Sequence, residues 1–565
     1  MYNKILIGII LIFIIIVPLS LMIRGLNLGH DVYAHLTYGK LFYQAFSEGQ
    51  FPVRWTESFR EGYSSPLFNF YQVGFYYLVA FFQSLNTPFI YSIKLSILFL
   101  WWFGTFFTYL FARRFGNLIG AISALVYSFS PYIILDIFVR ASYPEFMALS
   151  FMPSIFWGVD KLITTLKIRY IGFLSIFLAV AVYSHLPSVL IFSPIILGFA
   201  LLRLFHKRNE LVKKFSFLSL SLLLGLGLAS SYLLPAIFEL KYINISNLTS
   251  DAFDFRKHFV SLENLFTYVW GYNSSWMVPV TNTPLLMGIT QWTIFANSAV
   301  TLFKSKSNIQ RTYLIFWIFS IFYVLFFMNK GSLFIWENVK ALSYIQFPWR
   351  FFMVIPFASS IIAGILFSTF NNQSLKSLFI GVVLILNFMI YMSFSNNTKM
   401  INTSIFNLDF ESWVNNKEIQ KAAYFEEGYT PKGTENIIRE RIPHFSLNNK
   451  YSHAKQIVYK NTYQEYIISS ESNLIFTDNT HYFPGWKAYL NDHEIKINPT
   501  NNEYFMQVNI PRGESKLVFK FEDTFIRSIS NKISLVSLII IGLIFVFGTF
   551  KKSLQNLPLS TNFKR

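Results

Sequence analysis

Long apolar runs separated by short polar segments dominate the chain. A run of about 20 apolar residues is long enough to cross the hydrocarbon core of a bilayer as an α-helix. Such runs lie at residues 5–23, 89–112, 117–134, 144–160, 170–184, 188–205, 215–234, 284–303, 312–328, 351–369, 377–394 and 532–550. The pattern predicts a polytopic α-helical membrane protein with about twelve transmembrane helices.

One further apolar stretch, residues 67–85, decides on which side of the membrane every later loop lies. If it lies flat on the outer surface as an amphipathic helix, most Lys and Arg residues gather in the loops of the other side. Those residues are Lys4, Arg113, Arg114, Lys161, Lys167, Arg169, Arg203, Lys207, Arg208, Lys213, Lys214, Lys304, Lys306, Arg311, Lys376, Lys551, Lys552, Lys564 and Arg565. Because cytoplasmic loops are enriched in positive charge, we predict a juxtamembrane helix at 67–85 and both termini in the cytoplasm.

Three outer segments are then long, at residues 29–88, 235–283 and 395–527. The first two would be external loops of a transmembrane domain formed by residues 1–394. Residues 395–527 would form an extracytoplasmic, mainly-β domain, followed by a last transmembrane helix (528–550) and a disordered cytoplasmic tail (551–565).

Alternation of apolar and polar residues predicts strands in the second half of this domain. Tyr504, Met506, Val508 and Ile510 fall on one face of an extended segment. Asn491-Asp492 separates two short apolar stretches and predicts a hairpin turn. Regularly spaced short strands of this kind favour a small β-sandwich.

The composition excludes several classes of protein and site. The chain has 565 residues, of which 53% are hydrophobic and only 13% charged, about half the charged fraction of a soluble domain. It contains no cysteine, which excludes disulfides and thiolate chemistry. The net charge of +18 is explained by Lys and Arg in cytoplasmic loops, so we predict no nucleic-acid partner.

The first external segment carries the densest group of ionisable residues in an apolar chain. In the sequence GHDVYAH, Asp31 and His35 are four residues apart and share one face of a helix. Asp31 could remove a proton from an acceptor hydroxyl, or hold a divalent metal beside a phosphate. Alternatively, Asp31 caps a helix and His35 is a surface residue.

A second group lies in the sequence ILDIFVRASYPEF, with Asp136, Arg140 and Glu145. Asp136 and Arg140 are spaced as an i,i+4 pair and could form a plain surface ion pair. If this segment instead faces the same cavity as Asp31, Glu145 would be an acid and Arg140 a phosphate ligand.

Three further candidates lie at the predicted outer ends of membrane spans. His185, in YSHLPS, could donate to a phosphate or a sugar hydroxyl, or be a structural residue. Glu239, in LLPAIFEL, is either a site carboxylate or a solvated loop residue. Arg350, in QFPWRF, could bind phosphate oxygens in bidentate fashion, or anchor its helix at the membrane interface.

The chain resembles a known family in a series of motifs that occur in order along most of its length. These motifs are GHDVYAH, GYSSPLFNFY, FSPYIILDIFVRASYPEF, YSHLPS, YLLPAIFE, QFPWRF and HYFPGWKAYLNDHEIKINP. They resemble bacterial membrane proteins described as 6-pyruvoyl-tetrahydropterin synthase-related, and the neighbouring YfhO-like proteins. Both are similar in pattern to the GT-C glycosyltransferases.

The resemblance implies a GT-C-like membrane fold with an extracytoplasmic active site. It implies transfer of a sugar from a polyprenyl-phosphate-type donor, with the essential acid of the first external loop falling on Asp31. A second acid would fall on Asp136 or Glu145. Some relatives have a DxD metal pair where this chain has His30-Asp31, so a Mg²⁺ or Mn²⁺ cofactor stays an open alternative. The YfhO-like pattern further implies glycosylation of Gram-positive cell-surface polymers such as lipoteichoic acid.

Together these observations predict a membrane hexosyltransferase with three catalytic candidates, Asp31, Asp136 and Glu145. The residues expected to bind substrate or phosphate are His30, His35, Arg140, His185, Glu239 and Arg350. The expected partners are a lipid-linked sugar donor, a cell-envelope glycan or polymer as acceptor, and membrane lipid. Two alternatives are a transporter or flippase of lipid-linked precursors and a non-catalytic envelope-assembly protein.

Overall fold

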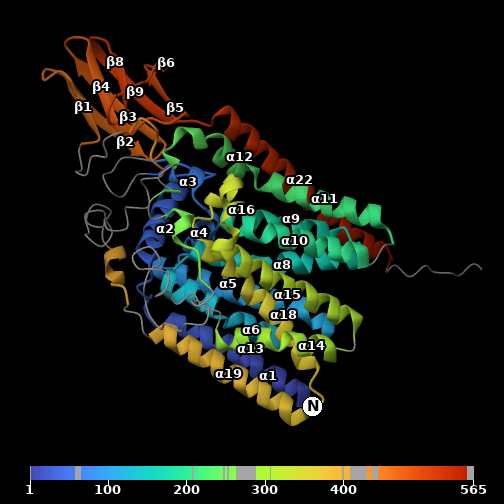
Figure 1. Ribbon diagram of the computed structural model, residues 1–565. Helices are drawn as coiled ribbons and strands as arrows, with labels where there is room; N and C mark the ends of the chain where they lie inside the picture. The colour runs from blue at the N-terminus through green and yellow to red at the C-terminus, as the bar shows by residue number, and fades with distance from the viewer. Residues whose placement is uncertain are drawn as a thin grey trace, which may run out of the picture.

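The computed structural model shows a bundle of helices with a β-sheet domain at one end (Figure 1). It describes residues 2–56, 65–206, 209–245, 249–250, 253–261, 288–305, 307–396, 400–407, 429–434 and 443–555. Most of the expected external loop 235–283 and the end of the expected tail lie outside these residues, and so do the ionisable residues Glu57, Arg60, Glu61, Asp251 and Glu263.

Nine helices in the described part are long and apolar enough to cross a membrane. They are α1 (Tyr2–Ile23), α5 (Phe89–Ala112), α8 (Tyr143–Thr165), α10 (Leu186–His206), α11 (Leu211–Leu228), α15 (Asn308–Met328), α18 (Ile355–Ser368) with the preceding 3₁₀ turn η10 (Pro348–Val354), α19 (Gln373–Asn396) and α22 (Phe525–Gln555). A tenth span is possible if α6 (Asn117–Ser128) is counted together with α7 (Pro131–Leu135) and the π-helical turn η2 (Asp136–Arg140), which follow after a bend of 40°. The chain is therefore a multi-pass membrane protein.

The expected count of about twelve spans exceeds the nine long helices of the described residues, because it included helices that are broken or short. Helix α9 (Arg169–Ser184) has only 16 residues. The expected span at 284–303 is divided into α13 (Ile289–Ala296) and α14 (Ser298–Lys304). Asn297 separates them, and its side-chain amide donates to the Thr293 carbonyl (2.8 Å), a local bond that competes with helix continuation. The expected span at 215–234 is likewise divided between α11 and α12 (Ser230–Phe238).

Residues 67–85 do not cross the bundle as one helix. They form two short helices, α3 (Leu67–Phe70) and α4 (Gly74–Ser84), and the longer of the two measures only about 16 Å. Helix α4 packs against α2 (Val32–Ser47), which follows the first span. The close approach of α4 to the end of α9 requires Gly74, since a Cβ atom there would lie 3.1 Å from the Ser184 amide nitrogen.

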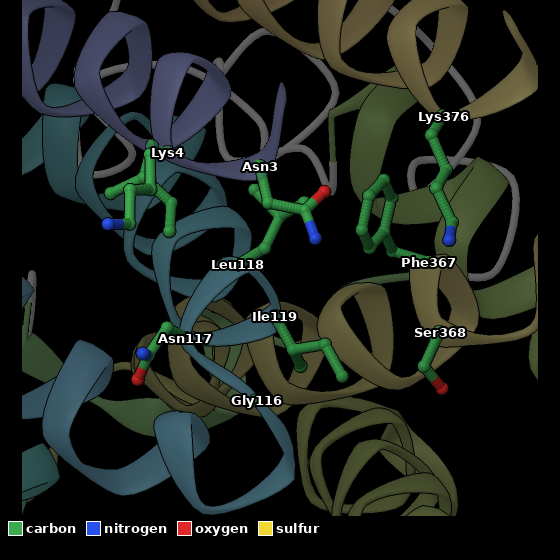
Figure 2. A pocket seen from close by; sticks show the side chains of 10 residues that line it. Asn3, Lys4, Gly116, Asn117, Leu118, Ile119, Phe367, Ser368 and Lys376 are labelled. Atoms are coloured by element: carbon green, nitrogen blue, oxygen red, sulfur yellow. The ribbon is translucent and has the colours of Figure 1, made fainter. Parts of the chain in front are cut away.

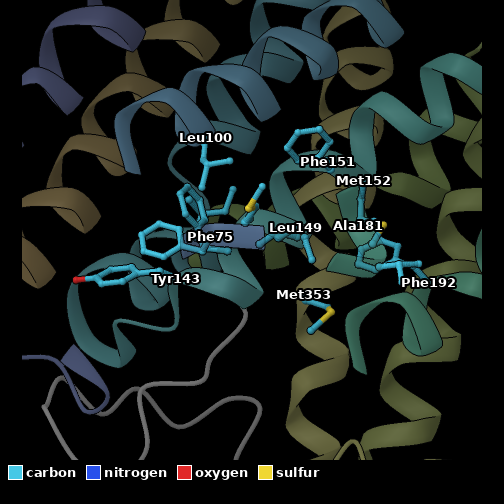
Figure 3. Close-up of a cluster of buried hydrophobic side chains, with 14 of the residues drawn as sticks. Phe75, Leu100, Tyr143, Leu149, Phe151, Met152, Ala181, Phe192 and Met353 are labelled. Carbon is cyan, nitrogen blue, oxygen red and sulfur yellow. The ribbon is translucent and has the colours of Figure 1, made fainter. Parts of the chain in front are cut away.

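The centre of the bundle is formed by α8 and by the η10–α18 segment. In each of them 89% of the apolar window is buried, compared with 28% in α1 and 17% in α22, so the latter two lie at the edge. A helix that is apolar on all sides is expected at such a central position. Figure 3 shows part of this core, where Phe75 of α4 packs on Tyr143 of α8, with 5.2 Å between the ring centroids.

In the described residues nine strands make two antiparallel sheets, with the orders β1-β4-β8-β7 and β2-β3-β9-β5-β6. The strands are β1 (Phe445–Leu447), β2 (His453–Lys460), β3 (Tyr463–Ser470), β4 (Leu474–His481), β5 (Trp486–Leu490), β6 (His493–Ile495), β7 (Asn498–Pro499), β8 (Phe505–Ile510) and β9 (Gly513–Phe521). The expected apolar face of β8 is buried. Asn491 and Asp492 form the expected β5–β6 turn, with φ angles of 48° and 68°.

The β domain contacts the bundle through residues far apart in the sequence. The indole of Trp55 is buried against Trp486 and Phe521, at centroid distances of 5.5 and 5.0 Å. Beside it, Glu48 at the end of α2 accepts two hydrogen bonds from Asn461, both 2.9 Å long. Helix α22 then returns from the domain along α11 and α12 (Figure 1).

A buried ion cluster joins four elements at the end of the bundle away from the β domain. Asp160 of α8 is hydrogen-bonded by Arg114 of the 3₁₀ turn η1 (Arg113–Phe115) and, at 3.1 Å, by Tyr313 of α15. Arg203 of α10 places its Nε 2.8 Å from the same Asp160 oxygen. We refer to Arg114, Asp160, Arg203 and Tyr313 as the Asp160 cluster.

Candidate active site

The backbone at residues 29–31, between α1 and α2, is fixed against the turn η2. The amides of His30 and Asp31 donate to the carbonyls of Val139 (2.8 Å) and Arg140 (3.0 Å). This approach requires glycine at position 29, because a Cβ atom there would lie 2.5 Å from the Cβ of Ala141. The two predicted groups of ionisable residues therefore meet.

The Asp31 side chain is half-buried and immediately precedes α2. It does not cap that helix, and within the described residues its carboxylate accepts no hydrogen bond. Burial raises its pKa above the ordinary 3.8, while the positive charges of His30, Arg140 and Arg350 act in the opposite direction. Asp31 is thus a partly accessible acid without a hydrogen-bond partner, close to two guanidinium groups.

Arg140 is fully engaged by the residues around it. Its guanidinium donates to both carboxylate oxygens of Glu145, at 2.7 and 2.9 Å, and also to Asp136. The Trp349 ring covers it at 4.6 Å, and the Tyr132 hydroxyl donates to Glu145 at 2.5 Å. The expected Asp136–Arg140 pair exists, but it is buried in a larger network and is not a surface ion pair.

Arg350, in contrast, keeps a free donor. Its Nε lies 3.3 Å from Glu145, and its Nη1 donates to the Ile345 carbonyl (2.7 Å) and to Gln346 (3.0 Å). Its Nη2 donates to no partner in the described part of the chain, and the side chain is 11% exposed. Glu145 therefore joins the two arginines and sets the position of Arg350. We refer to Asp31, Asp136, Arg140, Glu145 and Arg350 as the Asp31 cluster.

His35 lies inside a group of tyrosines and is not a surface residue. Its Nδ1 is 2.7 Å from the Tyr76 hydroxyl, and its ring is 5.6 Å from that of Tyr143. Burial, assisted by the charge of Arg140, lowers the pKa of His35 to about 3. The imidazole is therefore neutral at physiological pH and acts as a hydrogen-bonding group.

His185 and Glu239 have different surroundings. His185 is buried between α9 and α10, where its Nδ1 accepts from the Ser188 amide (3.2 Å). Glu239 accepts from Thr524 (2.7 Å) with one oxygen and from Arg527 (2.9 Å) with the other. Glu239 therefore attaches α22 to the bundle, and the structure gives it a structural partner in place of the expected substrate.

Two tyrosines that the sequence did not single out border the Asp31 cluster. Tyr71 and Tyr429 are both half-exposed, with rings 5.8 Å apart at 86°. The charge of Arg350 acts on both hydroxyls. Tyr429 comes from the segment between α19 and the β domain, and the next residue, Thr430, accepts hydrogen bonds from the Asn244 amide (3.1 Å) and side chain (3.2 Å).

The described residues do not form an evident metal site. No group of three or more His, Cys, Asp or Glu side chains in the described ranges could hold a metal ion. Near Asp31, the oxygens of Glu145 are already occupied by Arg140, and two guanidinium groups supply positive charge. We therefore derive no step through a metal.

Comparison with known proteins gives a limited result. No protein-family model and no curated protein matches the chain, so the YfhO-like and pterin-related resemblance of the motifs stays a prediction. Solved structures with some similarity are ArnT from Cupriavidus metallidurans bound to undecaprenyl phosphate (TM-score 0.40, 12% identity, 76% of this chain and 78% of that chain) and its apo state (0.38, 12%, 76% and 77%). A third is the apo oligosaccharyltransferase of Archaeoglobus fulgidus (0.40, 10%, 76% and 60%). Similarity at this level assigns neither a fold family nor an activity to the chain.

Proposed function

We propose that the chain is a GT-C-type membrane glycosyltransferase that moves a sugar from a polyprenyl-phosphate donor to a hydroxyl of a cell-envelope glycan or polymer. The observation that carries the proposal is the juxtaposition of a partly accessible, unpartnered carboxylate with a guanidinium that keeps a free donor. Asp31 and Arg350 are these two groups. The motif resemblance supports the same activity.

In this proposal Asp31 is the general base. It takes the proton from the acceptor hydroxyl as the hydroxyl oxygen forms a bond to the anomeric carbon of the sugar. The bond between that carbon and the phosphate oxygen breaks, and polyprenyl phosphate leaves with the electron pair. A base with a raised pKa accepts this proton more readily, which agrees with the burial of Asp31.

Arg350 receives the charge that develops on the leaving phosphate. Its unengaged Nη2 can donate to a phosphate oxygen, and a preorganised donor of this kind stabilises a transition state more than a ground state. Glu145 accepts from Arg140 with both oxygens and Asp136 with one, while the second oxygen of Asp136 has no hydrogen-bond partner in the described residues, and both carboxylates are fully buried. We therefore assign to these three residues the positioning of Arg350 and not a second base function.

The half-exposed pair Tyr71 and Tyr429 gives the site an aromatic wall. Aromatic rings pack against the apolar face of a sugar ring and offer a hydroxyl at their edge. In the proposal they contact the transferred sugar or the acceptor. Tyr429 belongs to the segment that leads to the β domain. An acceptor bound by that domain would therefore be linked to the Asp31 cluster through this segment.

The deciding experiment is an Asp31→Asn variant purified in detergent and assayed with a polyprenyl-phosphate monosaccharide. We expect transfer to fall at least about a thousandfold, because the variant cannot accept the proton. The control is Asp254→Asn, a carboxylate of the second external loop that pairs with Arg256. Mass spectrometry of envelope glycans from cells with each variant gives a second measurement. Full-rate transfer by Asp31→Asn would refute the assignment, and translocation of intact donor without bond cleavage would favour a flippase.

The proposal includes an extracytoplasmic site and cytoplasmic termini. Because the chain has no cysteine, single cysteines report their side of the membrane without further engineering. A cysteine replacing Tyr451, which is 76% exposed on the β domain, should react with an impermeant reagent from outside. A cysteine replacing the exposed Asn209, between α10 and α11, should not.

A further inference from the structure

A polar cavity lies at the end of the bundle away from the Asp31 cluster. Its volume is about 440 Å³, and it opens between the start of α1, the start of α6 and the junction of α18 with α19. Figure 2 shows its lining, in which Asn3 and Ile119 lie between Lys4 on one side and Lys376 on the other. The further lining residues are Ile7, Gly116, Asn117, Leu118, Phe367 and Ser368.

The lining of this cavity carries only positive charge. It includes Lys4 and Lys376 and no Asp or Glu. Within the described residues neither ammonium group has an ion pair or a hydrogen bond, although Lys376 lies 5.9 Å over the Phe367 ring. Of the remaining polar side chains, Asn3 and Asn117 can donate hydrogen bonds, whereas the Ser368 hydroxyl already donates to the Ile365 carbonyl (2.6 Å). This set of groups suits an anion with several oxygen atoms.

The backbone adds further donors to the same place. Three helices begin here, α1 at Tyr2, α6 at Asn117 and α19 at Gln373. Gly116 precedes α6 with φ = 137°, and no side chain caps that helix. The free amides of a helix start favour negative charge. They reinforce the two lysines, which are the main recognition elements.

The apolar part of the lining indicates what carries the anion. Ile7, Leu118 and Phe367 line the cavity, and the outer faces of the adjoining helices are apolar and exposed. These faces carry Ile5, Ile9 and Ile12 of α1 and Leu378, Val382 and Ile385 of α19. A free phosphate ion would make no use of them, whereas acyl chains would pack against them while the headgroup contacts the lysines.

We propose that this cavity binds the phosphodiester headgroup of an anionic diacyl phospholipid. The site is distinct from the proposed donor site, because Lys4 lies in the first turn of α1 and Asp31 follows the other end of this helix, whose 22 residues span roughly 33 Å. Tyr2 donates to the Gln373 carbonyl at 3.1 Å and so ties the starts of α1 and α19 together beside the cavity. A bound lipid would hold these two peripheral helices against α6.

Native mass spectrometry of the full chain in detergent tests this proposal without reference to any catalytic activity. Phosphatidylglycerol is added at increasing concentration, and phosphatidylcholine is the zwitterionic comparison. We expect the wild type to prefer phosphatidylglycerol, and we expect Lys4→Ala/Lys376→Ala to weaken that binding at least tenfold. Lys4→Arg/Lys376→Arg should retain it. The matched control is Lys161→Ala/Lys213→Ala, which removes the same charge outside the cavity.

Two competition arms distinguish the sources of phosphate. Inorganic phosphate at millimolar concentration should not displace phosphatidylglycerol, and displacement would show that the site takes a free anion. Undecaprenyl phosphate should compete no better than a second anionic phospholipid, and preferential binding that requires Lys4 and Lys376 would show a polyprenyl site instead. Equal binding of the two phospholipids, or full binding by the double alanine variant, would also overturn the proposal.

Discussion

The Asp31 cluster and the Asp160 cluster lie at opposite ends of the bundle and are built from the same kinds of side chain. Each joins two arginines to buried carboxylates, and each adds a tyrosine hydroxyl. They differ in the partners and the accessibility of the carboxylates Asp160 and Asp31. Asp160 receives two guanidinium groups and one hydroxyl from three neighbouring elements. The Asp31 carboxylate has no hydrogen-bond partner and is partly accessible.

This difference separates a structural ion cluster from a reactive one. Ionisable residues within membrane-spanning bundles are costly and are therefore good candidates for function, but buried charges can also serve to connect helices. In the Asp160 cluster, one acid and two cations connect α8 with η1 and α10. In the Asp31 cluster, Glu145 and Asp136 satisfy Arg140, which leaves Asp31 and one nitrogen of Arg350 available.

The largest expected effect tests the structural role of the Asp160 cluster. Asp160→Ala removes the acid and leaves Arg203, which is 1% exposed, without its counter-charge. Breaking a buried ion pair costs about 3–5 kcal/mol, so we expect a strongly lowered thermal stability in detergent. The surviving folded protein should transfer sugar at the rate of the wild type. An unchanged melting temperature, or a stable Asp160→Ala variant without transfer activity, would contradict a purely structural role of the Asp160 cluster.

The next effect tests the free donor of the Asp31 cluster. Arg350→Gln removes the guanidinium that faces the proposed leaving group, and loss of one such donor lowers kcat by about 10²–10³. Stability should fall less than in Asp160→Ala, because Arg350 keeps some exposure. The measurement is kcat and KM for transfer from a polyprenyl-phosphate sugar. Arg256→Gln, at a site where the arginine is 54% exposed and paired with two acids, is the control.

Should Arg350→Gln change only KM, Arg350 would bind the donor equally in the ground and transition states. Its role would then be recognition of the phosphate and not stabilisation of the leaving group. A variant with unchanged kcat and unchanged KM would remove Arg350 from the mechanism altogether.

A smaller effect tests the aromatic wall. Tyr429→Ala removes the ring that lies 5.8 Å from Tyr71, and we expect about a tenfold loss of kcat/KM, since one aromatic contact contributes about 0.5–1.5 kcal/mol beyond its buried area. Tyr429→Phe keeps the ring and should retain most of the activity. Tyr451→Ala, on a surface tyrosine of the β domain, is the control. Equal activity of Tyr429→Ala and wild type would exclude a substrate contact.

The fold class and all five members of the Asp31 cluster could be singled out from the sequence for one physical reason. An apolar run of membrane length is recognised from about 20 consecutive residues, and a charged residue such as Asp31 or Arg350 beside such a run is easily identified. The β-strand alternation of Met506 and Val508 is equally local. Each of these signals depends on neighbours in sequence only.

The features that the sequence did not predict depend on contacts between segments that are distant in the chain. Nothing local distinguishes Arg203, which was expected in a cytoplasmic loop, from the surrounding loop cations, yet its guanidinium is buried against Asp160. Tyr429 reaches the Asp31 cluster only because its segment pairs with residues 242–244. Similarly, the role of Glu239 follows from Arg527, which lies 288 residues later.

The smallest expected effect concerns pH and separates Asp31 from the histidine beside it. As a base Asp31 must be ionised, so the rate should fall as the pH decreases through its pKa, which burial holds above 3.8. His35, with a pKa of about 3, is already neutral throughout the range from 4 to 8. His35 should therefore contribute no limb of its own to the pH profile between pH 4 and 8.

His35→Gln sharpens this distinction, because glutamine can replace the hydrogen bond to Tyr76 but cannot titrate. We expect only a few-fold change in kcat, with the acid limb at the same pH as in the wild type. The measurement is kcat/KM between pH 4 and 8 for both proteins. An acid limb near pH 6.5 that disappears in His35→Gln would make the imidazole the base, and Asp31 would then be the group that orients it.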